Sequence, residues 1–327
     1  MKRIWWIFVS VTVSIIVVGY SVFVIRGILS HQPLSYSSLC SIDMVSTTEG
    51  WAVGDTVETP NSVLLHYMNG QWKQIALPSG MHSSDTLTGI AMINASEGWA
   101  IGVSQQTSNQ GFLGFFVHYE QGAWRVAGSS VPEAPRAISF LNASDGWVVG
   151  DNGLVVHFDG TKWSIVTLPP DLNGVYFTAV AITSPTDVWL AGGLGTIAHF
   201  DGKNWSRVNL PGVTGWIYGI AMISDKDGWA VGDLSDGNNS YALHDIAGIW
   251  TPVQLPKSAT LHAIVLGSNR EGWAVGDQGI VMHLTGDIWQ TQASATSNNL
   301  FAVSSSDNRT AWAVGEMGTI VHFQSNT

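Results

Sequence analysis

The chain has 327 residues, of which 45% are hydrophobic and only 11% are charged. Its 24 acidic residues outnumber its 13 basic ones, and the resulting net charge of −11 argues against a nucleic-acid partner. The one cysteine, Cys40, excludes an internal disulfide framework and a multi-cysteine metal site. The fold must therefore be held together by packing, and the 36 glycines and 16 tryptophans indicate tight turns between aromatic-rich strands.

The N-terminal region differs in composition from the rest of the chain. Residues 1–4 form a short stub, and residues 5–26 contain an uncharged run of 21 residues, Trp5 to Ile25. As a helix, this run would span roughly 31 Å at about 1.5 Å per residue, which is enough to cross one bilayer. A cleaved signal peptide is the alternative, but the run is longer than a usual signal core and no A-x-A-like site follows it.

Charges flank the apolar run unequally. Lys2 and Arg3 precede it, and Arg26 follows it. Under the positive-inside rule, the N-terminus stays in the cytoplasm and everything after the run is exported. We therefore expect a single-pass protein of the cell membrane. Residues 5–26 are its signal-anchor helix in the lipid bilayer, and residues 38–327 form an extracytoplasmic domain.

A tryptophan phrase recurs along the exported part of the chain. EGWAVGD occurs at Glu49 to Asp55 and again at Glu271 to Asp277. With close copies, the first tryptophans are spaced by 39 to 48 residues: Trp51, Trp99, Trp147, Trp189, Trp229, Trp273 and Trp312. This period is typical of propellers and solenoids, and each copy contains short apolar runs separated by turn residues. No helix-period stretch occurs beyond the anchor, so we predict an all-β fold: a seven-bladed β-propeller of four-stranded blades, preceded by one N-terminal transmembrane helix.

Other residues keep a fixed register with these tryptophans. One position of the third strand is histidine in all seven copies: His66, His118, His157, His199, His244, His283 and His322. In the first six copies a second tryptophan follows six residues later: Trp72, Trp124, Trp163, Trp205, Trp250 and Trp289. Because the histidines recur once per blade, we expect structural imidazoles hydrogen-bonded to a neighbouring turn rather than a shared metal or catalytic site.

Two further positions have an expected structural role. The acid two residues before the first tryptophan, such as Asp187, is expected to bond backbone amides of its own turn. The glycine three residues after that tryptophan, such as Gly54, is expected to meet a backbone requirement at the end of the strand.

The pattern in WVVGDNGLVVHFDGTKW, Trp147 to Trp163, resembles the bacterial BNR-like and YVTN-like repeat β-propellers, including the photosystem II stability and assembly factor type. The resemblance covers about residues 38–327 and implies the propeller fold. Assembly factors of that type are non-enzymatic and dock on a membrane-protein partner through a basic surface, whereas this acidic chain shows no comparable arginine cluster. WD40 relatives fit less well, because no Trp-Asp dipeptide occurs in the sequence.

Two classes of function are weighed for the exported domain. A sialidase-like glycoside hydrolase gathers three arginines around a substrate carboxylate, and only Arg136 is placed to reach a central site. Motifs of serine hydrolases, zinc proteases and phosphate-binding loops are absent from the sequence. We therefore expect no enzyme, no catalytic residue, no metal and no cofactor. We predict a non-enzymatic binding or scaffold module for a protein or glycan partner, with a glycoside hydrolase and a photosystem-type assembly factor as alternatives.

The connections from the second to the third strand and those between blades emerge on the same face of a propeller. Insertions at residues 56–60, 104–112 and 234–240 lengthen the first kind of connection, and variable loops on a rigid scaffold are the usual seat of recognition. The candidate binding residues on this face are Trp216, Tyr218, Tyr176, Phe177 and Arg136. Trp216 stands outside the repeat register, so it either packs as a lid over the core or contacts a partner.

The seventh copy is one strand short. A tryptophan six residues after His322 would be residue 328, one position beyond Thr327. An open ring leaves an unpaired strand edge, and propellers commonly borrow the missing strand from the other terminus. Residues 27–37 are therefore the candidate ring-closing strand, although Gly27 would then take the tryptophan position.

Overall fold

The computed structural model describes residues 37–56, 62–105, 112–233, 241–257, 259–307 and 309–325. The predicted transmembrane segment, residues 5–26, lies outside these ranges, as does all but Ser37 of the candidate ring-closing strand. Within the described ranges, no helix combines the length and the apolar character needed to cross a membrane.

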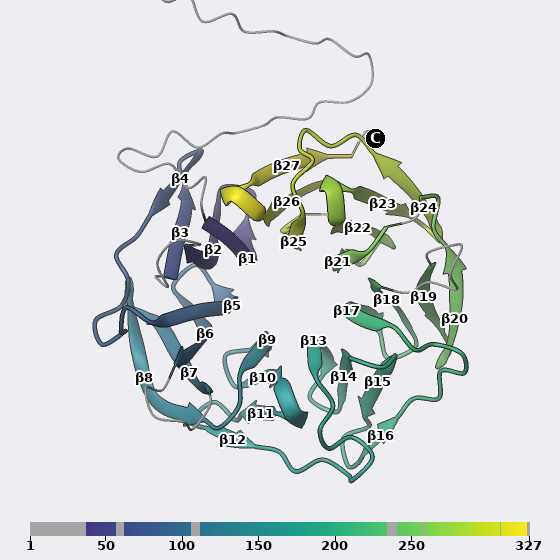
Figure 1. The fold of residues 1–327 in the computed structure, drawn as a ribbon, viewed down its shortest axis with the longest axis horizontal. Helices are drawn as coiled ribbons and strands as arrows, with labels where there is room; N and C mark the ends of the chain where they lie inside the picture. The colour runs from purple at the N-terminus through teal and green to yellow at the C-terminus, as the bar shows by residue number, and fades with distance from the viewer. Residues whose placement is uncertain are drawn as a thin grey trace, which may run out of the picture.

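Seven antiparallel sheets are arranged as blades around a central channel (Figure 1). Six blades have four strands each, and blade 7 has three within the described ranges. In every blade the strands follow sequence order from the channel to the rim. The predicted all-β, seven-bladed propeller is thus confirmed.

The strands of the blades fall into four concentric sets. The innermost strands are β1 (Ser37–Ser46), β5 (Asp85–Asn94), β9 (Pro135–Asn142), β13 (Phe177–Ser184), β17 (Trp216–Ser224), β21 (Leu261–Leu266) and β25 (Leu300–Ser304). The second strands are β2 (Glu49–Thr56), β6 (Glu97–Gln105), β10 (Asp145–Gly150), β14 (Asp187–Gly192), β18 (Asp227–Asp233), β22 (Glu271–Gly276) and β26 (Thr310–Gly315). The third strands are β3 (Ser62–Met68), β7 (Phe112–Glu120), β11 (Val155–Phe158), β15 (Thr196–Phe200), β19 (Tyr241–Ile246), β23 (Val281–Thr285) and β27 (Ile320–Gln324). The outer strands are β4 (Gln71–Gln74), β8 (Ala123–Val131), β12 (Trp163–Ile165), β16 (Trp205–Arg207), β20 (Ile249–Gln254) and β24 (Ile288–Gln292).

The second strand of every blade carries a buried tryptophan that packs on the histidine opposite it on the third strand. Trp189 pairs with His199 in register, and across the seven blades the centroids of these two rings lie 3.8 to 4.4 Å apart. In blade 4 the carboxylate of Asp187 accepts hydrogen bonds from His199 Nε2 at 2.6 Å, from Trp189 Nε1 at 3.1 Å and from the Thr183 hydroxyl. Histidine and carboxylate meet at 3.0 to 3.3 Å in three other blades, at Glu49–His66, Asp145–His157 and Asp227–His244.

These contacts correct one expectation from the sequence. The acids before the tryptophans were predicted to bond amides of their own turn, but the Asp187 carboxylate binds imidazole and indole N–H groups instead. A half-buried imidazole and a buried indole N–H each need an acceptor, and the carboxylate at the start of the second strand is in reach of both. The histidines therefore have a structural role in the blade.

The same tryptophans also tie each blade to the next, except that Trp273 of blade 6 meets Phe323 of blade 7 in place of a tryptophan. Trp147 of blade 3 meets Trp205 of blade 4 with centroids 5.7 Å apart and an interplanar angle of 74°. Edge contacts at 5.4 to 5.8 Å recur in the pairs Trp51–Trp124, Trp99–Trp163, Trp189–Trp250, Trp229–Trp289 and Trp312–Trp72. The last pair crosses from blade 7 to blade 1, where the two ends of the ring meet. Each such pair adds about 0.5–1.5 kcal/mol beyond the buried area.

The glycine three residues after each of these tryptophans allows two backbones to approach closely. A Cβ atom at Gly232 would lie 1.9 Å from the Trp216 carbonyl oxygen, and one at Gly54 would lie 2.0 Å from the Ser38 carbonyl oxygen. Gly276 has an extended backbone, with a φ of −170°. Contact with the inner strand, rather than backbone conformation, therefore excludes a side chain at this position.

The tryptophan pairs predict coupled stabilities. Trp147→Leu and Trp205→Leu should each lower the free energy of unfolding, and chemical denaturation of the double variant should show a coupling of about 0.5–1.5 kcal/mol. Trp147→Leu combined with Trp289→Leu, in distant blades, is the matched control and should be additive. Additivity for the Trp147 and Trp205 pair would show that the edge contact does not hold the blades together.

Candidate binding surface

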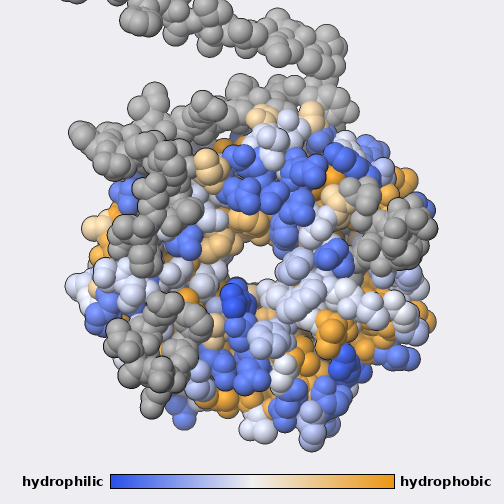
Figure 2. Space-filling view, viewed as in Figure 1, coloured by the Kyte–Doolittle hydropathy of each residue, from blue (hydrophilic) through white to orange (hydrophobic). Residues whose placement is uncertain are grey.

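The face of the ring that bears the connections between blades also bears the links between second and third strands. Three of these links are short helical turns, η2 (Asp151–Gly153), η3 (Asp277–Gly279) and η4 (Glu316–Gly318). We call this side the loop face and the opposite side, which bears the turns between third and outer strands, the turn face. Figure 2 shows the channel open through the ring, with apolar side chains in orange over blades 4 and 5, outward of the channel edge.

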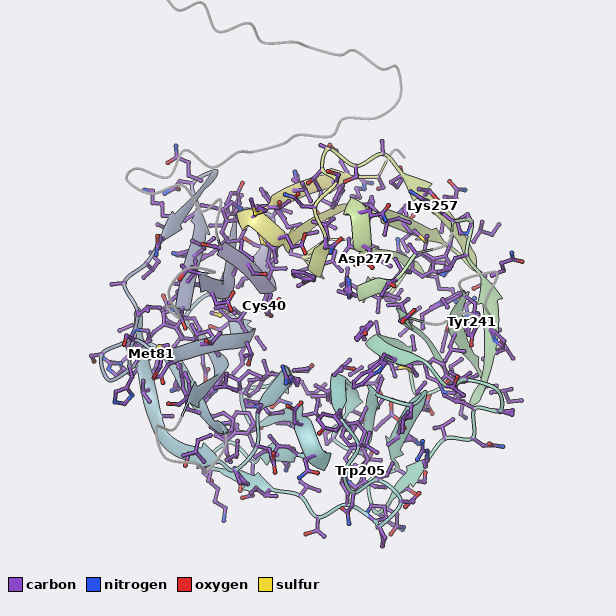
Figure 3. The ribbon with its side chains drawn as sticks, in the orientation of Figure 1. Cys40, Met81, Trp205, Tyr241, Lys257 and Asp277 are labelled. Atoms are coloured by element: carbon purple, nitrogen blue, oxygen red, sulfur yellow. The ribbon has the colours of Figure 1, made fainter. Side chains whose placement is uncertain are left out.

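The innermost strands share a bulge near the loop face. In each blade the register with the second strand skips the residue that follows the first buried apolar residue of the inner strand. The skipped residues are Cys40, Thr88, Arg136, Thr178, Tyr218, His262 and Phe301. All seven line the central channel, whose cavity volume is about 510 Å³. Figure 3 shows Cys40 and Asp277 of η3 close to this opening, whereas Trp205 lies farther out toward the rim.

The three small bulge residues bond one blade to the next. Thr88 donates a hydrogen bond to the Pro135 carbonyl oxygen at 2.9 Å, and the Thr178 hydroxyl donates to the Ile217 carbonyl oxygen of the next blade at 2.5 Å. The Cys40 sulfur lies 3.4 Å from the Leu87 carbonyl oxygen, and burial raises the pKa of its thiol to about 12. The thiol is therefore protonated and unreactive at neutral pH.

The large bulge residues extend into an arc of rings around the mouth of the channel. Tyr218 lies 6.2 Å from Trp216 and 5.4 Å from His262, between ring centroids. Trp216 lies 6.3 Å from Tyr176 on one side, and His262 lies 5.4 Å from Phe301 on the other. We call these five rings the aromatic arc. It runs from the connection before blade 4 to blade 7.

The end of the arc at blades 4 and 5 is the most exposed. The exposed fraction is 50% for Tyr176 and 39% for Trp216. The indole of Trp216 lies against Gly193, where an added Cβ atom would approach it to 3.3 Å. The next residue, Leu194, is 76% exposed and has a φ of +55°, a conformation that bulky side chains rarely adopt.

Arg136 lies next to the arc on the loop face. Its guanidinium donates two hydrogen bonds to the Asp151 carboxylate, at 2.8 and 2.7 Å. This bidentate pairing raises the pKa of Arg136, and the Tyr176 phenol adds a smaller effect in the same direction. The positive charge at this position is thus already compensated within the protein.

Negative charge accompanies the middle of the arc. His262 Nε2 lies 2.7 Å from the Asp277 carboxylate. Burial raises the pKa of the Tyr218 phenol, and the carboxylates of Asp233 and Asp277 raise it further. Asp233 is exposed and pairs in register with Trp216 across β17 and β18. The phenol therefore stays neutral and lies in a negative potential.

The structure separates the predicted binding residues. It brings Tyr176, Trp216 and Tyr218 together in the arc and places Arg136 beside it. Phe177, in contrast, is fully buried in the core of blades 3 and 4, so its side chain cannot contact a partner. Its position explains the burial, because Phe177 is the first inward residue of β13. The three insertions lie largely outside the described residues.

Two members of the arc, His262 and Phe301, were not predicted from the sequence, and neither was Leu194. A signal for the first two is present. The bulge residue is the most variable letter of a frame in which an aliphatic residue precedes it and a small residue and a β-branched residue follow it, as in LCSI, LTGI, IYGI, LHAI and LFAV. Leu194 had a weaker signal. It occupies a turn position that is Asn152 in blade 3, where asparagine suits positive φ.

A second cavity, of about 810 Å³, opens on the turn face between blades 4 and 5. Its lining includes Asp187, His199 and Trp189, which are already engaged in the structural unit of blade 4. Arg207, also on its wall, donates to the Thr196 hydroxyl at 2.7 Å. Within the described ranges, no group of three or more histidine, cysteine, aspartate or glutamate side chains is arranged to hold a metal ion.

The seam between the ends of the ring is held from the channel side. The Asp43 carboxylate accepts a hydrogen bond from the Met92 amide of blade 2 at 2.7 Å and one from the Ser304 hydroxyl of blade 7 at 3.4 Å. Ser304 in turn accepts from the Met44 amide at 2.9 Å. Burial raises the pKa of Asp43 from 3.8 to about 6.

Solved structures of other propellers have the same fold as this chain. A structure of YCF48 bound to D1 peptide is 16% identical, covers 92% of this chain and 99% of its own, and has a TM-score of 0.68. Virginiamycin B lyase from Staphylococcus aureus is 17% identical over 91% of this chain and 97% of its own, with a TM-score of 0.70. The WD40 propeller domain of Doa1 is 10% identical over 95% and 99%, with a TM-score of 0.67.

These similarities concern the fold, because all three identities are low. No family model matches the chain, and no curated protein matches its sequence. The propellers include an enzyme and a peptide-bound protein, so the fold does not by itself decide the function. The function therefore depends on the residues of the loop face.

The half-buried carboxylate of Asp43 predicts a pH-dependent stability. The pKa of Asp43 is higher in the folded state than in the unfolded chain, so its contribution is fully present below about pH 4 and is lost as pH rises through 6. Asp43→Asn should therefore be more stable than the wild type at pH 8, by about 3 kcal/mol at most, and the advantage should disappear near pH 4. Urea denaturation at both pH values measures this difference. A difference that does not change with pH would contradict it.

Proposed function

We propose that this protein is a membrane-anchored, extracytoplasmic β-propeller that binds a protein partner on its loop face and has no enzymatic activity. The observation that carries the proposal is the exposed end of the aromatic arc, where Tyr176 and Trp216 adjoin Leu194. The anchor is the apolar run from Trp5 to Ile25. Externally added protease should cleave the propeller on intact cells, or on spheroplasts if an outer membrane exists, and protection in spheroplasts would exclude this orientation.

The backbone conformation of Leu194 is energetically unfavourable for a leucine. A non-glycine residue at φ +55° is held in a sparsely populated region at a cost on the order of 1–3 kcal/mol, and asparagine or glycine would reduce it. Exposing the Leu194 side chain to water gives no compensating burial within the chain. The equivalent turn residues Asn152, Gln278 and Met317 have the same positive φ, so this conformation belongs to the repeated turn. In blade 4 an exposed leucine occupies the position, and burial of Leu194 against a partner would offset the cost.

The side chains at the exposed end of the aromatic arc are of the kind found in protein interfaces. Trp216 and Tyr176 present large apolar areas with few rotatable bonds, and such side chains dominate interface energies when polar groups surround them. The peptide bound to YCF48 supports a polypeptide partner for a propeller of this fold. We do not propose the photosystem role, because that resemblance implies docking through a basic surface and Arg136 is neutralised by Asp151.

An enzyme that uses His262 as a base is the second candidate. The specific observation in its favour is the 2.7 Å contact between His262 and Asp277 at the mouth of the channel, which orients the imidazole. A sialidase-like site receives less support, because Arg207 and Arg270 bind groups at other places in the ring. Turnover that is lost in His262→Gln, while partner binding is retained, would favour the enzyme.

The proposal predicts which variants lose the partner. Leu194→Asn should reduce capture of a specific membrane protein by the tagged full-length chain, while its melting temperature stays equal or rises. Trp216→Ala should reduce capture further, since truncating an interface anchor costs about 2 kcal/mol or more. Quantitative mass spectrometry of the captured proteins measures both effects.

The matched control is Ile288→Asn on the turn face, where the wild-type side chain is 65% exposed. This variant should leave capture unchanged. If Ile288→Asn reduces capture and Leu194→Asn does not, the recognition surface is the turn face and the proposal is wrong.

A further inference from the structure

We infer that the partner places a basic side chain, an arginine or a lysine, on the stacked Trp216 and Tyr218 rings between the carboxylates of Asp233 and Asp277. This inference rests on the proposed function and adds the chemistry that the loop face recognises. It follows from three features of the described rim: the orientation of the two rings, the position of the two carboxylates and the compensation of the nearby cation.

The rings form a platform of suitable geometry. Trp216 and Tyr218 are nearly parallel, with an interplanar angle of 14° and centroids 6.2 Å apart. Neither ring is covered completely: Trp216 is exposed and Tyr218 is half-buried on the channel wall. A guanidinium or ammonium group is attracted to the faces of such rings within about 6 Å of the centroid.

The carboxylates lie on both sides of this platform. Asp233 is the cross-strand partner of Trp216, and Asp277 lies next to His262, which is the following member of the arc. The side chain of Asp277 is 40% exposed although it contacts His262. Both charges reach the Tyr218 phenol, since both raise its pKa. A cation at this position is favoured by the rings and by two carboxylates.

Among the residues that the structure describes, no lysine or arginine forms an ion pair with Asp233 or Asp277. Arg136, the bulge residue of blade 3, is held by Asp151 through two hydrogen bonds. Two further acidic groups of the rim bond neutral donors instead of cations. Glu133 accepts a hydrogen bond from the Asn152 side chain, and Glu316 accepts one from the Asn299 side chain. An acidic partner would be repelled here, and a basic one would be steered toward the mouth of the channel.

The choice between the two basic side chains follows from ring geometry. The planar guanidinium of arginine stacks on Trp216 and can bond a carboxylate with two N–H groups at once. The ammonium group of lysine makes the same electrostatic contacts without stacking. The platform should therefore bind arginine more tightly than lysine.

The test uses the full-length protein labelled with 5-fluorotryptophan and followed by ¹⁹F NMR. The probes are N-acetyl-arginine methylamide and its neutral counterpart N-acetyl-citrulline methylamide, which has nearly the same shape. The Trp216 resonance is assigned by its loss in Trp216→Phe. We expect arginine to shift this resonance saturably, with at least fivefold higher affinity than citrulline, and added salt should weaken its binding.

Two variants locate the cation. Asp233→Asn and Asp277→Asn should each weaken arginine binding by about two- to fivefold, the range of a partly exposed ion pair. Asp225→Asn is the matched control, because Asp225 is 62% exposed on the turn face. Unfolding midpoints equal to that of the wild type ensure that the loss is local.

The inference is overturned if citrulline binds as tightly as arginine, or if the Asp233 and Asp277 variants bind arginine like the wild type. Because the assay contains no partner protein, this failure is distinct from failure of the proposed function. Capture that still depends on Leu194 and Trp216 would then leave the proposed surface intact and remove only its preference for a basic side chain.

Discussion

The structure depends on one repeated contact, the tryptophan of the second strand held between two rings. The indole ring packs on the histidine of its own blade and also meets the edge of a tryptophan from the next blade. Trp147, for example, lies between His157 and Trp205. A single aromatic group thus packs on the neighbouring strand of its own sheet and on the sheet of the next blade. Repetition of this contact keeps the blades equivalent, so the inner strands present the same bulge at each step around the channel.

Equivalent backbone positions let the ring vary the side chain at the bulge without changing the fold. Blades 1, 2 and 4 place small polar groups there, which bond to the inner strand of the next blade. Blades 5 to 7 place rings there instead, and these form the arc with Trp216. The loop face is consequently asymmetric although the scaffold is repetitive. Asp43 shows that the channel side also strengthens the seam where the ends of the ring meet.

Sequence patterns predicted the features that repeat and missed those that occur once. The register of Trp189, His199 and Gly192 was readable because seven copies share it, and the propeller follows from that register. The partner of Asp187 was predicted wrongly, since spacing along the chain does not show that a carboxylate faces the neighbouring strand. The expectation that Phe177 lies at the surface is wrong, because aromatic character alone does not distinguish an inward from an outward position at the start of a strand. Residues 5–26 and 27–37 remain predictions.

The proposed function requires a polypeptide partner to dock on the exposed end of the aromatic arc. The most direct measurement replaces single side chains by the photo-cross-linking amino acid p-benzoylphenylalanine in living cells. Position Tyr176 on the loop face is compared with position Ile249 on the turn face, which is 66% exposed. We predict a discrete cross-linked polypeptide from position 176 and none from position 249. A cross-link formed only from position 249 would contradict it.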